Sequence, residues 1–372
     1  MYRRLFTLLL TIFLFSAFTD QNENTEQTKK HDPVFIHIQN SWIDSVFASL
    51  SEEERIAQLF IISAYSNKSI EHVNYISSQI EKYNVGGLIF FQGGPFRQTE
   101  LINLYQNKAK TPLLIGLDAE WGIGMRLDST IVFPHQMMLG AIQNDSLIYE
   151  FGKDVALQCK TVGVHINFAP VVDINNNSLN PVINSRSFGE DKENVTRKSY
   201  FYMQGMQESG ILTSAKHFPG HGDTEADSHY TLPVIKHNKR RIQNLEMYPY
   251  KFLIDNGLSG VMVAHLNIPS LEKEENRAST LSVEIVQKLL KDKLNFKGLI
   301  YTDALNMKGV TDHFPPGRIE IEALKAGNDV LLFPVDLAIG IDSIKAAVQR
   351  GEISQKRIDE SCKKILKAKY YA

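Results

Sequence analysis

The chain has 372 residues, 43% of them hydrophobic and 22% charged, and its formal net charge is −2. These proportions are ordinary for a globular protein, and the length fits one large α/β domain or two smaller ones. Acidic and basic residues are interspersed and no basic stripe occurs, which argues against a nucleic-acid partner.

The first 19 residues have the features of a secretory signal peptide. A short positively charged start precedes an apolar run at 5–18, with Ala17 and Thr19 near the end of the run. The run is shorter than the roughly 20 residues of a membrane span. We expect cleavage near Ala17 or Thr19, with an uncleaved N-terminal anchor as the alternative. Either outcome predicts a protein secreted across the inner membrane, periplasmic or associated with the cell envelope, with any membrane tether confined to this segment.

Residues 20–40 are predicted to form a linker, because their first part is polar and has no periodic apolar pattern. Residues 41–372 are predicted to form a single catalytic domain, an α/β fold of the (β/α)8 TIM-barrel type. Mostly continuous apolar runs alternate with helical stretches, as in βαβ units with buried strands. Eight runs favour a barrel over a doubly wound sheet, and no G-x-G-x-x-G follows the first ones. The runs lie at 59–64, 87–91, 113–118, 165–173, 211–217, 260–265, 298–303 and 329–333, and helical stretches lie at 235–255, 281–293, 318–326 and 336–349.

The two cysteines, Cys159 and Cys362, argue against a thiolate metal site. They lie far apart and outside any CxxC or Cys/His spacing. The simplest interpretation is two buried thiols that pack as small hydrophobic residues, and a disulfide between them is the alternative.

Ionisable residues end five of the apolar runs. A barrel carries its active site at the carboxyl ends of its strands, so these side chains are predicted to meet at one face. They are Asp118, Asp173, Lys216 with His217, His265 and Asp303.

Asp303, within GLIYTDALNM, is the first candidate for chemistry. A carboxylate at a barrel mouth can attack an anomeric carbon, bind a metal or accept a hydrogen bond from a substrate. A helix N-cap is the competing interpretation, because Ala304 and Leu305 follow.

The segment KHFPGHGDTEADSH at 216–229 gathers the most titratable side chains. Proline and glycine at 219–222 predict a loop. Asp227 and His229 are two residues apart, so in an extended segment they point the same way. A carboxylate bonded to an imidazole fixes its tautomer and supports proton transfer near neutral pH, with a purely structural pair as the alternative.

Several segments carry a resemblance to a known family. KHFPGHG followed by DSH at this spacing is similar to the signature of NagZ-type β-N-acetylglucosaminidases, so the chain resembles glycoside hydrolase family 3. The similarity runs from about residue 50 to 340. The other similar segments are LDAEWG at 117–122, NFAPVVDI at 167–174, SRSFGED at 185–191 and YTDALNM at 301–307.

The resemblance implies a retaining exo-β-N-acetylhexosaminidase that releases terminal non-reducing N-acetylglucosamine from glycans such as peptidoglycan fragments. Asp303 would be the nucleophile, His229 the proton donor and acceptor, and Asp227 its partner. No cofactor or metal is implied, and we expect a monomer with a carbohydrate substrate. The residues implied to hold the sugar are Asp118, Arg126, Arg186, Lys216 and His217, with Asp173 and His265 as support.

The segment at 117–122 departs from the family pattern D-x-E-G-G-R, because Trp121 and Ile123 stand where Gly and Arg are usual. An aromatic side chain such as Trp121 can stack on a sugar or pack within the protein, and the sequence favours neither.

Three other functions stay open at this point. A metal-dependent barrel hydrolase would take its ligands from His217, His221, Asp223, Asp227 and His229. A non-catalytic glycan-binding protein would keep the barrel without the chemistry. A β-N-acetylglucosaminide phosphorylase would exploit a histidine acid/base, which leaves room for an anionic acceptor.

Overall fold

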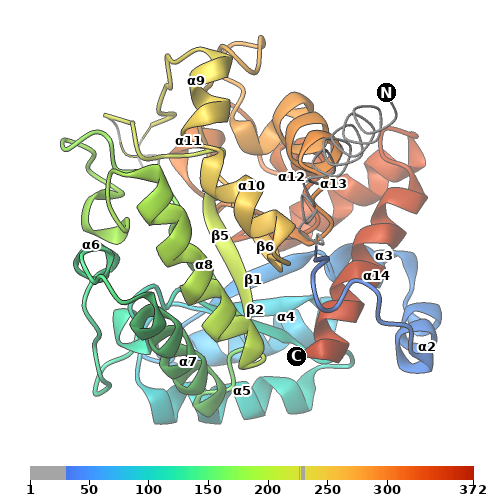
Figure 1. Ribbon diagram of the computed structural model, residues 1–372. Helices are drawn as coiled ribbons and strands as arrows, with labels where there is room; N and C mark the ends of the chain where they lie inside the picture. Colours follow the sequence, from blue (N-terminus) through green and yellow to red (C-terminus); the bar gives the residue numbers. More distant parts are fainter. Residues whose placement is uncertain (1–30, 226, 228–230) are drawn as a thin grey trace, which may run out of the picture. The chain divides into compact units, whose positions relative to one another are not determined.

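The computed structural model describes residues 31–225, 227 and 231–372. Eight parallel strands form the centre of residues 31–372 and helices surround them (Figure 1). Neighbouring strands pair in the order β7-β6-β5-β4-β3-β2-β1-β8, and a parallel bridge between Tyr301 and Val330 joins β7 to the residues before β8. The predicted (β/α)8 barrel is therefore confirmed. The strands are β1 (Phe60–Ala64), β2 (Gly87–Phe90), β3 (Leu114–Leu117), β4 (Ile166–Asn167), β5 (Leu212–Phe218), β6 (Gly260–Val263), β7 (Leu299–Thr302) and β8 (Leu331–Leu332).

The barrel interior is filled by large side chains that require small neighbours. The rings of Phe168 and Tyr301 meet edge to face with centroids 5.2 Å apart. A Cβ at Gly116 in β3 would lie 2.6 Å from the Phe168 ring, so only glycine fits there. The continuous apolar runs of the sequence thus correspond to strands that are buried on both faces.

All eight predicted runs contain a strand, but two strands differ from prediction in ways that matter for the site. β4 ends at Asn167, so Asp173 stands on the irregular segment beyond it rather than at the end of a strand. β5 continues to Phe218, one residue beyond the predicted run, so Lys216 and His217 lie within the strand rather than at its end. Both segments stay paired, because Val171 forms a parallel bridge with Lys216.

The predicted helical stretch 318–326 corresponds to α12, whereas 235–255 is two helices, α9 and α10. Pro249 stands in the first turn of α10, where its missing N–H costs nothing, and it is incompatible with one continuous helix. The 281–293 stretch is largely a π-helix, η4. The helices are α2 (Ser41–Ser49), α3 (Glu52–Ala57), α4 (Ile70–Tyr83), α5 (Pro95–Lys108), η1 (Ile123–Met125), α6 (Gln136–Gly140), α7 (Asp145–Thr161), η2 (Asn184–Arg186), α8 (Lys192–Glu208), α9 (Lys239–Asn244), α10 (Tyr248–Asp255), η3 (Ser279–Leu281), η4 (Glu284–Lys293), α11 (Lys308–Thr311), α12 (Arg318–Ala326), α13 (Leu337–Gln349) and α14 (Gln355–Tyr371).

The packed part of the chain begins before residue 41. Phe35 is fully buried in the core, and Lys367 of α14 donates to the carbonyl of Ile36 at 2.7 Å. Residues 31–40 of the predicted linker therefore pack against the barrel, because they contain an apolar side chain that the polar part of the linker lacks. The predicted segment 1–19 and the start of the linker lie outside the described residues.

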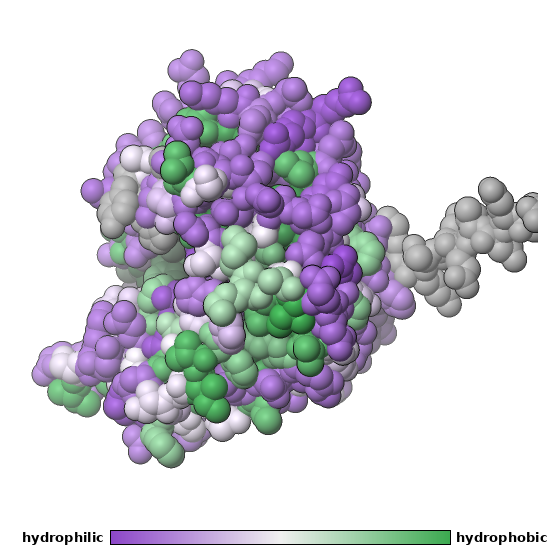
Figure 2. Space-filling view, turned by 60° about the vertical axis from the view of Figure 1, so that its left-hand side comes forward, coloured by the Kyte–Doolittle hydropathy of each residue, from purple (hydrophilic) through white to green (hydrophobic). Residues whose placement is uncertain are grey.

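Cys159 in α7 and Cys362 in α14 are free and buried, as the simplest interpretation of the sequence predicted. Burial raises the pKa of each thiol to about 12, which makes both unreactive near neutral pH. Among the described residues, none of the helices is long and apolar enough to cross a bilayer. Figure 2 shows a mostly hydrophilic face on which hydrophobic residues gather in the lower half.

Candidate active site

A cavity of about 470 Å³ opens at the carboxyl ends of the strands. It brings together six of the predicted site residues, from elements far apart in the sequence. One side is polar and the other is apolar and aromatic. The lining consists of Tyr65, Ile89, Phe91, Asp118, Met125, Arg126, Val182, Arg186, Lys216, His217, His221, Met262, Asp303, Ala304, Asn306, Met307, Leu332 and Phe333.

Asp118 follows β3 directly and binds two cations. Its Oδ2 accepts from Arg126 at 2.6 Å, and its Oδ1 accepts from Lys216 at 2.7 Å. Burial alone would raise the pKa of Asp118, but the charges of Lys216 and Arg126 outweigh burial and hold it far below its ordinary value. The carboxylate is therefore a permanent anion at neutral pH, which suits it to accept strong hydrogen bonds.

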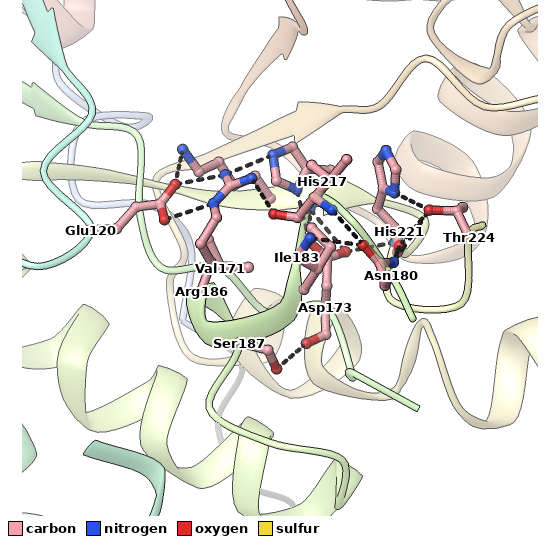
Figure 3. Close-up of polar contacts among 12 residues, drawn as sticks. Glu120, Val171, Asp173, Asn180, Ile183, Arg186, Ser187, His217, His221 and Thr224 are labelled. Carbon is pink, nitrogen blue, oxygen red and sulfur yellow. Dashed lines mark hydrogen bonds and ion pairs between the residues drawn. The ribbon is translucent and has the colours of Figure 1, made fainter. Parts of the chain in front are cut away.

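Glu120 is part of the same network, and the sequence interpretation missed it. Its carboxylate accepts from Arg186 Nη2 at 2.7 Å and Nε at 2.9 Å, and it lies 2.8 Å from Lys216 Nζ (Figure 3). Burial alone would raise the pKa of Glu120, but the charges of Arg186 and Lys216 lower it to about 2. The available signal was its spacing, since Asp118 and Glu120 point the same way in an extended segment.

Asp173 organises the two histidines of the 216–221 stretch. Its Oδ2 lies 2.7 Å from His217 Nδ1, and its Oδ1 accepts from the backbone N–H of His221 at 2.7 Å (Figure 3). Burial alone would raise the pKa of Asp173, but the interactions with His217 and His221 lower it. Because a carboxylate only accepts, Nδ1 of His217 carries a proton, and Nε2 faces Arg186 Nη2 at 3.4 Å.

Asp303 follows β7 and lines the same cavity as this polar network. Its Oδ1 accepts from the N–H of Ala304 at 2.8 Å, and its own N–H donates to Val263 at 3.0 Å. His265 lies 2.9 Å from the Ala304 carbonyl through Nε2 and 2.8 Å from Thr280 through Nδ1. His265 thus fixes the turn that carries Asp303, which is the supporting position that the sequence predicted.

The segment after β5 is folded back on itself. His221 Nδ1 lies 2.8 Å from Thr224 Oγ1, and burial lowers the pKa of His221 to about 4, so its ring is neutral. The Asp223 carboxylate contacts Nε2 of His237, a residue to which the sequence assigned no function. Asp227 is described and its carbonyl accepts from Thr231, but His229 lies outside the described residues. The Asp227–His229 pair stays a prediction.

Three of the five proposed metal ligands are engaged with other side chains. His217 contacts Asp173, His221 contacts Thr224 and Asp223 contacts His237. Within the described ranges, no group of three or more His, Cys, Asp or Glu side chains is arranged to hold a metal ion.

The opposite side of the cavity is aromatic, which the sequence did not reveal. Tyr65, Phe91 and Phe333 follow β1, β2 and β8, and the rings of Phe91 and Phe333 meet edge to face at 5.3 Å. Phe333 has φ 49°, a left-handed backbone conformation that is uncommon for a bulky residue and is often found at functional sites. Arg126 joins the two sides, because its guanidinium lies 3.9 Å from the Phe91 ring centroid.

The Trp121 side chain packs within the protein. Its ring stacks on His135 with centroids 4.2 Å apart and 22° between the planes. Trp121 is absent from the cavity lining, which favours packing over a sugar platform.

Comparison with known proteins assigns the family. Residues 51–368 match the glycosyl hydrolase family 3 N terminal domain. Beta-hexosaminidase A of Pseudoalteromonas piscicida is 31% identical over 326 residues, which cover 79% of this chain and 54% of that protein. A family 3 beta-N-acetylglucosaminidase from Paenibacillus sp. str. FPU-7 superposes with a TM-score of 0.82 at 34% identity, covering 87% of this chain and 63% of that one. The beta-glucoside phosphorylase BglX superposes with a TM-score of 0.84 at 26% identity, covering 89% and 60%.

This chain thus spans between about half and two thirds of the length of these three proteins. The matched region contains the whole barrel and every residue that lines the cavity. The chain belongs to glycoside hydrolase family 3.

Proposed function

We propose that the chain is a retaining exo-β-N-acetylhexosaminidase that removes terminal non-reducing N-acetylglucosamine from glycans such as peptidoglycan fragments. The observation that carries this proposal is the position of Asp303. It lines the same cavity as Asp118, Arg126, Arg186 and Lys216, a set of charged groups suited to sugar hydroxyls. A nucleophile and a sugar-binding network are thereby combined in one pocket.

The proposed reaction has two steps. Asp303 attacks the anomeric carbon while the glycosidic C–O bond breaks, and His229 donates a proton to the leaving oxygen. Water then attacks the same carbon, His229 accepts its proton, and the bond to Asp303 breaks to release the sugar and restore the carboxylate. Two inversions give net retention of configuration.

The polar network contributes by being fixed before substrate arrives. Lys216 is shared between Asp118 and Glu120 at 2.7 and 2.8 Å, and Arg186 is held by Glu120 through two bonds. Groups held in this way need little reorganisation when charge develops on the sugar. The assignment of His229 rests on the sequence, and the Asp227 carboxylate two residues away would stabilise the imidazolium.

Phosphorolysis is the second candidate, because one structural neighbour is a beta-glucoside phosphorylase. In that reaction phosphate replaces water in the second step and needs no deprotonation by His229. A cavity side that carries Arg126, Arg186 and Lys216 is compatible with an anionic acceptor.

The decisive experiment is an aryl β-N-acetylglucosaminide assay of the full chain with and without phosphate. Hydrolysis independent of phosphate and of a chelator supports the proposal, whereas sugar 1-phosphate as the main product would replace it with phosphorolysis. Asp303→Ala is expected to lose about 10⁴-fold or more in kcat. With an activated aryl substrate, His229→Ala is expected to accumulate a glycosyl adduct on Asp303, detectable by mass spectrometry. Wild-type rates in Asp303→Ala, or a wild type that binds N-acetylglucosamine without cleaving any glycoside, would contradict the mechanism.

We also propose export across the inner membrane, with action in the periplasm or at the cell envelope. The support is the charged and apolar pattern of residues 1–19. Fractionation of cells that express the full chain is expected to place the activity outside the cytoplasm, and deletion of residues 2–19 is expected to retain it inside.

A further inference from the structure

The side chains of Trp121 and His135 stack on each other in the loop after β3 and near the start of α6. The loop after β3 returns on itself, because the N–H of Phe133 donates to the Trp121 carbonyl at 3.2 Å. This brings the indole of Trp121 against the imidazole of His135 with a centroid distance of 4.2 Å. The contact restricts the rotation of the imidazole and leaves its ring nitrogens free to reach other groups.

His135 makes its side-chain bond to the turn that carries a sugar-binding residue. Its Nδ1 lies 2.9 Å from the Ser185 hydroxyl, and Ser185 directly precedes Arg186 in η2. The residue before Ser185, Asn184, has φ 37°, in the left-handed region that most residues avoid. Asparagine tolerates this conformation better than most residues, and the His135–Ser185 contact adds support to the turn.

His135 itself is anchored. It is the N-cap of α6, and the next residue, Gln136, is buried and donates to the Val171 carbonyl at 3.0 Å. At the other end of α6, Asn194 donates to the Gly140 carbonyl at 3.0 Å. The imidazole therefore connects the Ser185 hydroxyl to α6, which is itself bonded to the segment after β4.

The same loop supports Arg186 twice. Glu120 holds the guanidinium through two bonds, whereas His135, stacked on Trp121, contacts the hydroxyl of Ser185, the residue before Arg186. Either contact alone would restrain only the guanidinium or only the backbone end of the Arg186 side chain. Two adjacent residues of the loop thus control both ends of Arg186.

We propose that His135, stacked on Trp121, is a positioning residue that sets the place of Arg186 in the sugar-binding pocket. This inference rests on the proposed function, since it assumes that Arg186 binds the sugar. It also explains why an aromatic side chain at position 121, where the family usually has Gly, is compatible with the site: Trp121 is not part of the cavity lining and stacks on His135, which contacts the residue before Arg186.

The test compares His135→Ala, His135→Asn and Ser185→Ala with an exposed control, His313→Ala. An Asn amide can place a polar atom where Nδ1 stands. If Arg186 binds the sugar equally in the ground and transition states, its displacement raises KM and leaves kcat unchanged. We expect His135→Ala and Ser185→Ala each to raise KM for the aryl glycoside, and Kd for N-acetylglucosamine, roughly tenfold, the scale of one lost hydrogen bond. His135→Asn is expected to recover most of this loss. The double variant His135→Ala/Ser185→Ala is expected to have a KM no higher than that of either single variant.

Several results would overturn the inference. One is a wild-type KM in His135→Ala. Another is a His135→Asn variant as defective as His135→Ala, and a third is a fully additive double variant. A wild type without glycosidase activity and without affinity for N-acetylglucosamine would instead contradict the proposed function, so the two failures are distinguishable. A parallel experiment with Trp121→Phe and Trp121→Gly is expected to preserve KM in the first and raise it in the second.

Discussion

The two sides of the cavity are built on opposite physical principles. On the β3–β5 side, Asp118, Glu120 and Lys216 form buried ion pairs that fix each charge before substrate binds. On the β1, β2 and β8 side, Tyr65 and Phe91 offer rings and almost no charge. The first side is sensitive to the loss of any one partner, because a buried charge left alone is costly. The second side depends on shape, where volume-conserving changes are tolerated.

This contrast indicates which side orients the sugar hydroxyls and which side provides shape complementarity to the substrate. Charged groups at fixed positions specify where hydroxyl groups must lie, whereas aromatic rings accept the apolar face of a sugar or an acetyl methyl group. Arg126 belongs to both sides, since it pairs with Asp118 at 2.6 Å and lies over Phe91. Variants on the charged side and variants on the aromatic side should therefore differ in the size of their effect and in whether stability or substrate affinity changes.

The largest effect is expected for Lys216→Met. The substitution leaves Asp118 and Glu120 buried next to each other without the cation that they share, so the free energy of unfolding should fall by about 3–5 kcal/mol. Denaturant unfolding measures this, and glycosidase activity should be lost as well. The matched control is Lys108→Met, which removes an exposed ion pair with Glu81 and should cost at most about 1 kcal/mol. Similar losses of unfolding free energy in Lys216→Met and Lys108→Met would show that the buried network is no more sensitive than an exposed ion pair.

The next effect is a loss of stability in acid that depends on Glu120. The folded-state pKa of Glu120, about 2, lies below its ordinary value of 4.5, so its contribution is present above pH 4.5 and disappears as pH falls towards 2. Denaturant unfolding between pH 7 and pH 3 should show this fall, and Glu120→Gln should flatten it.

Glu320 is the matched control for this pH dependence. Burial raises the pKa of Glu320, so its contribution has the opposite sign and is lost as pH rises through the folded pKa. Glu320→Gln should therefore leave the acid-induced loss at least as steep as in the wild type. An unchanged profile in Glu120→Gln would show that the network does not control stability in acid.

The sequence allowed prediction of those parts of the site that depend on local order along the chain. Asp118 and Asp303 follow continuous apolar runs, and in a parallel barrel such residues converge at one face whatever their partners. Glu120 escaped notice because its role depends on Arg186, 66 positions further along the chain, and no spacing rule connects the two. The aromatic side was missed for the same reason, since Phe91 and Phe333 meet only after the barrel has closed.

Strand limits were predicted less well than strand existence. The 165–173 run is mostly apolar, yet only Ile166–Asn167 forms a regular strand. An apolar sequence predicts that a segment is buried but not that it pairs as a strand. The segment up to Asp173 is buried without regular strand pairing. Lys216 shows the converse, because a charged residue that ends an apolar run is still a strand residue when its partners lie inside the fold.

A moderate effect is expected for Phe91→Leu, which tests the link between the two sides. The change keeps the position apolar, so the free energy of unfolding should fall by no more than about 1.5 kcal/mol. Loss of the contact with Arg126 should raise KM a few-fold, the scale of about 0.5–1 kcal/mol for a cation–π interaction. Steady-state kinetics with the aryl glycoside measure this, with Phe314→Leu, near Arg277 at 5.7 Å, as a control outside the cavity.

The smallest effect is expected for Lys68→Ala at the rim of the aromatic side. The Lys68 ammonium lies 3.6 Å from the Tyr65 ring centroid, but the lysine is exposed, and water competes with the ring for its charge. The free energy of unfolding should therefore fall by at most about 1 kcal/mol, with KM close to the wild-type value. If the variant instead lost substrate affinity as severely as Lys216→Met, charge would control the aromatic side too, and the division of the cavity into a charged and a shape-dependent half would be wrong.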